Sequence, residues 1–332
     1  AVVSSYSSQN KPNIGVAKMR DPRLSKLGEM HMASKLVPAD VVYVDMPTGT
    51  EEVSKGFGIG GQLLNHLQKS DALMIVARGF ENPSVADERG GVDVMRDITE
   101  MLLELSFVDL VVLERRLEKV KDSFKSAKQQ ERTWLMKELV LLEKIQTGLE
   151  NEILIQHQVL DSEDRKAISG YRFLTDKPII SIANVGEESL GQLEATEEKL
   201  RSEFGAHQVS TAVLCGKLEI ELAQMSLGEE TGFRKEMGLP SESGLDRMVR
   251  LCYKALGQMT FFTAGPKEVH AWTVAMGSNA LMAAGRIHSD LQRGFIRAEI
   301  MGYEDFIACG SEVEAKKRGK LRQEGKTYVM RD

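Results

Sequence analysis

Two apolar stripes with the spacing of a coiled coil run through the middle of the chain. Apolar residues recur at intervals of three and four in each stripe, and the polar segment SAKQQER separates the two. This spacing keeps one side of a helix apolar, so two such helices can bury their stripes against each other. The sequence therefore predicts an antiparallel helical hairpin, an arm over residues 109–171. The stripes consist of Leu110, Leu113, Leu117, Val120 and Phe124, then Leu135, Leu139, Leu142, Ile145 and Leu149.

Short apolar strands precede and follow this arm. They are VVYVD (41–45) and ALMIVAR (72–78) before it, and PIISIA (178–183) and VSTAVL (209–214) after it. Helical segments separate the strands, and this alternation is typical of an α/β fold with a doubly wound, mostly parallel sheet. We therefore expect the arm to interrupt one α/β domain, formed by residues 1–108 and 172–228.

Residues 258–332 have a different character. Three predicted strands, MTFFTAG, VHAWTVA and GKTYVMR, accompany a single short helix in GSNALMAAGRIH. This mixture predicts a compact α+β domain. Residues 229–257, which precede it, are expected to form a helical linker.

Composition disfavours some classes of protein. The 332 residues carry a net charge of −6, which argues against a surface that binds nucleic acid throughout, so we expect no DNA partner. No apolar run approaches the roughly 18 residues of a membrane span, so no membrane partner is expected. Three scattered cysteines match no zinc spacing and indicate a reducing, cytoplasmic compartment. One basic cluster is compatible with RNA phosphates or with a solvated face: Lys316, Lys317, Arg318, Lys320 and Arg322.

Asp45 closes the strand VVYVD. The apolar run predicts a buried parallel strand, and open α/β sheets bind their ligands at the carboxyl ends of such strands. Asp45 is therefore placed either to hold Mg²⁺ through a water molecule or to cap the next turn. The glycine-rich loop from Gly49 to Gly61 suits a segment that moves as a switch.

Polar residues also follow two later strands. Asn184-Val185-Gly186-Glu187 comes after PIISIA, and Cys215-Gly216-Lys217 comes after STAVL. An asparagine side chain offers both a donor and an acceptor to the edge of a purine, and small residues beside it let backbone N–H groups approach closely. Each segment alone is typical of a helix cap or a turn. At neighbouring strand ends, the two together predict a site that binds a nucleotide base.

Glycine motifs for phosphate binding are absent or out of place. The chain contains no G-x-x-x-x-G-K-[ST] phosphate loop. Gly56, Gly58 and Gly61 match G-x-G-x-x-G, but roughly ten polar residues separate them from the strand that this dinucleotide motif requires. We therefore expect no NAD site.

Several segments resemble the YchF-like ATPases, an Obg-related branch of the P-loop GTPases, in the order of that family. They are DPRLSKL, VVYVD…SKGFGIGGQLL, ARGFEN, RDITEMLLEL, KPIISIANVGE and LCGKLEIELA. The segment FFTAGPKEVHAWTVA, continued to GYEDF, is similar to the family's TGS domain, a ubiquitin-like β-grasp. The resemblance covers nearly the whole chain. It implies a P-loop-type nucleotide-binding domain with the inserted coiled-coil arm, followed by a TGS domain over residues 258–332.

The resemblance also implies a nucleotide and a partner. The family's N-x-x-E motif, here Asn184 to Glu187, replaces N-K-x-D and implies ATP in preference to GTP. Val185 and Lys217 would flank the base, and Asp45 would lie on the side of Mg²⁺. The implied partner is the ribosome or a ribosomal subunit, with RNA as a further candidate, reached through the arm and the TGS domain. We expect a monomer.

The chain departs from the family pattern at several places, two of which concern the phosphates of the nucleotide. The family's P-loop lies before the point where the match begins, and its DxAG motif reads Asp45-Met46-Pro47-Thr48, with glycine one place late. Two hypotheses follow. The first is an ATP-binding switch on the ribosome, which hydrolyses ATP to ADP and phosphate if a P-loop precedes Ala1. The second is a non-catalytic scaffold that binds the ribosome or RNA through the arm and the TGS domain.

Overall fold

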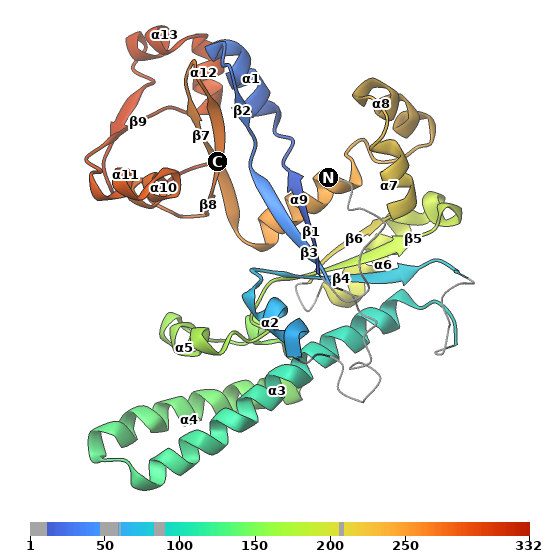
Figure 1. Ribbon diagram of the computed structural model, residues 1–332, viewed down its shortest axis with the longest axis vertical. Helices are drawn as coiled ribbons and strands as arrows, with labels where there is room; N and C mark the ends of the chain where they lie inside the picture. The colour runs from blue at the N-terminus through green and yellow to red at the C-terminus, as the bar shows by residue number, and fades with distance from the viewer. Residues whose placement is uncertain (1–11, 47–58, 60, 83–89, 206–208) are drawn as a thin grey trace. The chain divides into compact units, whose positions relative to one another are not determined.

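The computed structural model describes residues 12–46, 59, 61–82, 90–205 and 209–332. They fall into two compact units, whose residues can be located by the colour scale of Figure 1. Of the described residues, the arm unit contains those of 12–13 and 45–244, and the terminal unit contains those of 14–44 and 245–332. Within the described ranges, no helix has both the length and the apolar character needed to cross a membrane.

A parallel three-stranded sheet is the centre of the arm unit. Its strands are β4 (Leu73–Gly79), β5 (Ile179–Val185) and β6 (Ser210–Leu214), in the order β4-β5-β6. Each was predicted as a parallel strand, and β5, which has a neighbour on both sides, has its first five residues buried. The apolar side chains of β5 serve both faces of the sheet. Four helices accompany the sheet: α2 (Gly61–Lys69), α6 (Leu193–Phe204), α7 (Gly216–Leu222) and α8 (Leu227–Glu236).

The predicted hairpin is confirmed in α3 (Val94–Ser126) and α4 (Gln129–Glu150), which lie side by side (Figure 1). α3 begins at Val94, before the start of the predicted arm at residue 109. Its side chains pack in two separate hydrophobic cores. Its early residues, such as Ile98 and Leu102, pack with the sheet. Its later residues, such as Leu113 and Leu117, pack with α4. One continuous helix thus joins the arm to the sheet, and α5 (Ser162–Ile168) adds Ile168 to the core of the arm.

Asp109 lies where α3 passes from one core to the other. Its carboxylate is buried and accepts hydrogen bonds from the backbone N–H of Leu174 (2.8 Å) and from the N–H and Oγ1 of Thr175 (both 2.7 Å). These bonds attach the helix to the segment that leads into β5. Burial raises the pKa of Asp109 to about 6, against the opposing effect of the three donors.

The terminal unit combines the two ends of the described chain. Its three-stranded sheet has the order β2-β8-β7, with β7 antiparallel and β2 parallel to β8. Leu24 and Leu27 pack in one core with Val249, Val269 and Phe306. The elements before residue 46 are β1 (Asn13–Lys18), α1 (Pro22–His31), β2 (Leu36–Val37) and β3 (Asp40–Asp45). The later elements are α9 (Gly244–Ala255), β7 (Gln258–Ala264), β8 (Val269–Ala275), α10 (Ala280–Ile287), α11 (Ser289–Arg293), β9 (Ala298–Ile300), α12 (Tyr303–Cys309), α13 (Glu312–Lys317) and β10 (Arg322–Glu324).

The strand VVYVD differs from its prediction as a buried parallel strand. It forms β3, which pairs with β1 in a two-stranded sheet, and Val42 and Val44 are 59% and 43% exposed. Alternating burial of this kind is typical of a strand with one covered face. The compact units also cut across the predicted domains, because residues 14–44 pack with residues 245–332. The domain boundaries drawn from the sequence stay a prediction.

The end of the chain also differs in detail from its prediction. The segment GKTYVMR is not a strand; it forms one isolated antiparallel bridge, between Asn279 and Val329. The reason is that its backbone bonds to the start of α10, where Tyr328 O accepts from Ala280 N (2.8 Å). The single helix expected after β8 is α10, and three further short helices follow it: α11, α12 and α13.

The pKa of Asp109 predicts a pH-dependent contribution to stability. Because the folded state binds this proton more tightly than the unfolded chain, the contribution is complete below about pH 4 and is lost as the pH rises through about 6. The difference in unfolding free energy between the unsubstituted protein and Asp109→Asn should therefore fall by roughly 2 kcal/mol between pH 4 and pH 7. Urea denaturation at several pH values measures it. Asp122→Asn, an exposed change on the same helix, is the control, and a difference that does not change with pH would contradict the prediction.

Candidate functional site

The carboxyl ends of β5 and β6 lie next to each other in the arm unit. In the register of the two strands, Asn184 is opposite Leu214, the last residue of β6. The segment Cys215-Gly216-Lys217 follows at once and begins α7. The structure therefore brings together the two loops that were predicted from the sequence to form a base-binding site.

A direct hydrogen bond joins the two loops. The side-chain oxygen of Asn184 accepts from the backbone N–H of Gly216 at 2.9 Å. A Cβ atom at position 216 would lie 3.1 Å from that oxygen, which is closer than most Cβ contacts, so the approach favours glycine. Within the described chain, the amide nitrogen of Asn184 makes no hydrogen bond, so its two N–H donors are available to a ligand.

An ion pair joins the same two loops further along. Lys217 Nζ lies 2.8 Å from Glu187 Oε1. The hydrogen bond from this ammonium to the carboxylate raises the pKa of Lys217, so the side chain stays a cation and a donor at neutral pH. The Lys217 and Glu187 side chains are 73% and 50% exposed, so the pair faces solvent.

The side chains of Val185 and Cys215, unlike those of the polar residues of the proposed site, do not face solvent. Both side chains are buried in the core of the arm unit, with Leu218 and Leu222. Only the backbone of these two residues can reach a ligand. Their apolar side chains instead anchor the loops on either side of Asn184 and Gly216.

Asp45, the predicted carboxylate beside Mg²⁺, has no contact with these loops among the described interactions. Its carboxylate accepts a hydrogen bond from Asn13 Nδ2 at 3.4 Å. In the described part of the chain, no group of three or more His, Cys, Asp or Glu side chains is arranged to hold a metal ion. Most of the glycine-rich loop from Gly49 to Gly61 lies outside the described residues.

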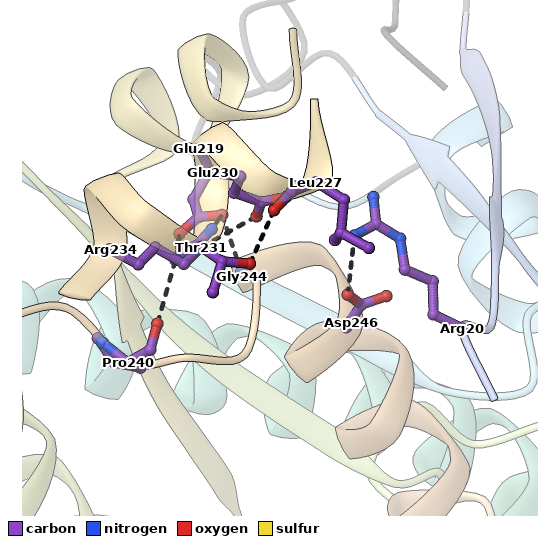
Figure 2. Close-up of polar contacts among 9 residues, drawn as sticks. All are labelled: Arg20, Glu219, Leu227, Glu230, Thr231, Arg234, Pro240, Gly244 and Asp246. Atoms are coloured by element: carbon purple, nitrogen blue, oxygen red, sulfur yellow. Dashed lines mark hydrogen bonds and ion pairs between the residues drawn. The ribbon is translucent and has the colours of Figure 1, made fainter. Parts of the chain in front are cut away.

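A buried network behind the site was not predicted from the sequence. Arg234 of α8 is only 2% exposed and donates to both carboxylate oxygens of Glu219 on α7, at 3.1 and 2.7 Å (Figure 2). It also donates to Glu230 at 3.0 Å, and Glu219 accepts from the backbone N–H of Gly244 at 2.8 Å. The network fixes α7 against α8. The sequence signal that points to it is the Glu230–Arg234 pair, at the i, i+4 spacing of a helix.

Hydrogen bonds to carboxylates and burial have opposite effects on the pKa of Arg234. Burial by itself lowers the pKa of the guanidinium, but the hydrogen bonds to Glu219 and Glu230 outweigh it, and the pKa is raised. The arginine is therefore charged and its two carboxylate partners are satisfied. Such a network tolerates the loss of one member poorly, because the remaining charges are left without a counter-ion.

A cavity lies within the terminal unit. It has a volume of about 900 Å³ and runs along β7, where Phe261 and Phe262 line it. Residues of α1 and α10, such as Leu27 and Ala284, line it as well. None of the residues proposed for the base site borders it, whereas Lys320 and Arg322 of the basic cluster do. At the candidate site, the side chains of Glu187 and Lys217 are exposed.

Comparisons with known proteins cover almost the whole chain. Residues 258–332 match the family model YchF-GTPase_C, described as a protein of unknown function (DUF933). The chain is 37% identical over 323 residues to the ribosome-binding ATPase YchF of Bacillus subtilis, a match that covers 97% of this chain and 87% of that protein. It is 39% identical over 324 residues to the protein of the same name from Haemophilus ducreyi, with the same coverage. Among solved structures, the Schizosaccharomyces pombe YchF GTPase matches with a TM-score of 0.85 and 26% identity, covering 99% of this chain and 87% of that one.

The Arg234 network predicts a large difference between two arginine substitutions. Arg234→Leu leaves Glu219 and Glu230 without their shared cation, and we expect it to lower the unfolding free energy by about 3–5 kcal/mol. Arg293→Leu removes an exposed pair with Asp290 and should cost less than about 1 kcal/mol. Chemical denaturation of both variants measures the two costs. Equal costs would show that the buried network does not stabilise the unit.

Proposed function

This chain belongs to the YchF family, and from this premise we propose that it is an ATP-binding, P-loop-type NTPase that acts as a regulatory switch on the ribosome. The observation that carries the proposal is the similarity to ribosome-binding ATPases over 97% of the chain. The loops at the ends of β5 and β6 supply a base site consistent with it. Ribosome association in turn supports a place in the cytoplasm.

The polar groups at the two strand ends have the chemistry of a purine site. The amide N–H groups of Asn184 are donors, and Glu187 and Lys217 supply an acceptor and a cation beside them. Val185 and Cys215 contribute backbone and hold the loops in the core. In this proposal, the site takes ATP in preference to GTP.

Besides the base, the protein would have to bind the phosphates of the nucleotide and the Mg²⁺ that accompanies them. Asp45 is the residue of this chain proposed to lie near Mg²⁺, through water, since a carboxylate oxygen is a ligand that suits this hard cation. The 332 residues include no G-x-x-x-x-G-K-[ST] motif, so the proposal assigns no phosphate-binding or hydrolytic residue. Hydrolysis of ATP to ADP and phosphate depends on such a loop.

The ribosome is the proposed partner, and two surfaces are proposed to bind it. One is the arm formed by α3 and α4, and the other is the TGS domain over residues 258–332. RNA is a candidate contact for the basic residues near the end of the chain, of which Lys316 and Lys317 are exposed. DNA and membranes are not proposed as partners, and the protein is proposed to be a monomer.

A second function is favoured by the departure at Asp45-Met46-Pro47-Thr48, where the glycine of the family's DxAG motif comes one place late. The protein would then be a scaffold that binds the ribosome or RNA through the same two surfaces without hydrolysing ATP. The two functions differ in whether a nucleotide changes binding to the ribosome. In a switch it must, because a ligand shifts an equilibrium only by its difference in affinity for the two states.

The base site predicts a specific loss of nucleotide binding. Asn184→Ala removes the donors toward the base and also leaves the N–H of Gly216 without its acceptor. We expect ATP to bind at least about tenfold more weakly. Titration with fluorescent ATP and GTP measures both affinities. Asn151→Ala, at the end of α4, is the control, and equal affinity of the unsubstituted protein for ATP and GTP would overturn the ATP preference.

Sedimentation with ribosomes separates the switch from the scaffold. A switch should sediment with ribosomes to a different extent when ATP is present, whereas a scaffold should sediment equally with and without ATP. Purified ribosomal subunits in separate runs identify the partner. A protein that remains in the supernatant under every condition would remove the ribosome from both proposals.

A further inference from the structure

A short segment at the base of the arm, residues 173–177, lies between the two hydrophobic cores of the arm unit. It leads directly into β5. Phe173 packs in the core of the arm and Leu174 in the core of the sheet, and they are only 3% and 0% exposed. We call residues 173–177 the root segment.

The root segment is bonded to several parts of the arm. Thr175, which is fully buried, donates to Asp109 of α3 through both its N–H and its Oγ1. Its carbonyl oxygen accepts from the N–H of Gln156, in the segment after α4, at 3.0 Å. Asp176 accepts from Arg165 of α5 at 2.9 Å. A displacement of the root segment would therefore act on the arm through three separate attachments.

Lys177, the last residue of the root segment, is bonded to α2 instead. Its Nζ donates to the backbone oxygen of Gln68 at 2.9 Å and to that of Ser70, at the carboxyl end of the helix. Carbonyl groups at this end of a helix lack partners within the helix and lie at the negative end of its dipole, so they attract a cation. Lys177 thus attaches α2 to the segment that holds the arm.

α2 is packed less firmly than the root segment. None of its nine residues is fully buried, and only partly buried side chains such as Leu64 and Leu67 pack against the core of the sheet. Elements with few buried contacts are those that change position at the lowest cost in free energy. In the sequence, α2 begins at the end of the glycine-rich loop that was predicted to move as a switch.

We propose that Lys177 couples nucleotide binding to ribosome binding, by transmitting a displacement of α2 through the root segment to the arm. This inference rests on the proposed function, because it names how the proposed switch would reach the proposed ribosome-binding arm. A displacement of α2 moves the carbonyl groups that hold Lys177. The backbone N–H of Lys177 donates to Leu174 O at 3.3 Å, so the segment is closed by a turn. Its buried residues pass a displacement on, since packed interiors are hardly compressible.

A purely structural role for Lys177 would be to cap the end of α2. The two roles differ in what they affect. A cap contributes to stability alone, whereas a coupling residue also sets how far ATP changes the affinity for the ribosome. Linkage requires the ribosome to change the affinity for ATP by the same factor, so the coupling can be measured from the side of the nucleotide.

The test compares the dissociation constant of fluorescent ATP with and without saturating ribosomes. The ratio of the two constants is the coupling factor, and we expect it to differ from one by at least about fivefold in the unsubstituted protein. Lys177→Met keeps an unbranched side chain and removes the ammonium that holds α2. We expect its coupling factor to lie within about twofold of one, with the affinity for ATP alone unchanged.

A matched control and a second measurement separate coupling from capping. Lys69→Met removes an exposed lysine from the same end of α2, and within the described chain this lysine has no bond to the root segment, so its coupling factor should be unchanged. Hydrogen exchange of the unsubstituted protein needs no folded variant. Addition of ATP should change the exchange rates of the backbone N–H groups of Leu174 and Thr175, which bond to Asp109.

The possible results distinguish this inference from the proposed function. A coupling factor that survives Lys177→Met, or that falls equally in Lys69→Met, would overturn the inference and leave the switch standing. Exchange rates in the root segment that ATP does not change would overturn it as well. An unsubstituted protein with a coupling factor of one would remove the proposed switch, and this inference with it.

Discussion

The hydrogen-bonded ladder around β5 is the interaction on which the candidate site depends. β5 pairs in parallel with β4 over its whole length and with β6 over five of its residues. Its side chains from Ile179 to Ala183 are buried, so a shift of one residue would move each of them to the opposite face and disrupt their packing. This register sets Asn184 opposite Leu214 and so brings two loops, far apart in sequence, to one edge of the sheet.

Around that ladder, one set of residues holds the loops in place and another set is exposed to solvent. Buried side chains hold the loops: Val185 and Cys215 in the apolar core, and Glu219 through its bonds to Arg234 behind α7 (Figure 2). Exposed side chains, Glu187 and Lys217, carry the charge that a ligand would meet. A site built in this way keeps its geometry while its polar groups stay accessible, which is what selective recognition requires. Asp109 has a similar supporting part at the base of the arm, where it attaches α3 to the segment before β5.

Much of this arrangement could be predicted from patterns in the sequence. The three-and-four spacing of leucines identified the hairpin, and short β-branched runs identified β4, β5 and β6 within about two residues. The polar residues after β5 and β6 identified the loops that meet. The prediction that VVYVD is buried was wrong, because β3 lies in a two-stranded sheet that leaves Val42 exposed. An apolar run shows which residues a strand contains and does not show how many neighbouring strands or helices cover it. The segment GKTYVMR was likewise strand-like in composition, but its backbone bonds to the start of α10.

The sequence by itself determined the local elements and the chemical types of the candidate site, because helix and strand periodicity and loop chemistry depend on near neighbours along the chain. Only the tertiary structure decided which segments pair and pack together. It joined residues 14–44 to residues 245–332 in one core, and it placed Glu187 within 2.8 Å of Lys217. It also buried Arg234 between carboxylates on two helices. These contacts join residues far apart in sequence or depend on how helices pack, and their free energy depends on burial and distance, which no single segment specifies.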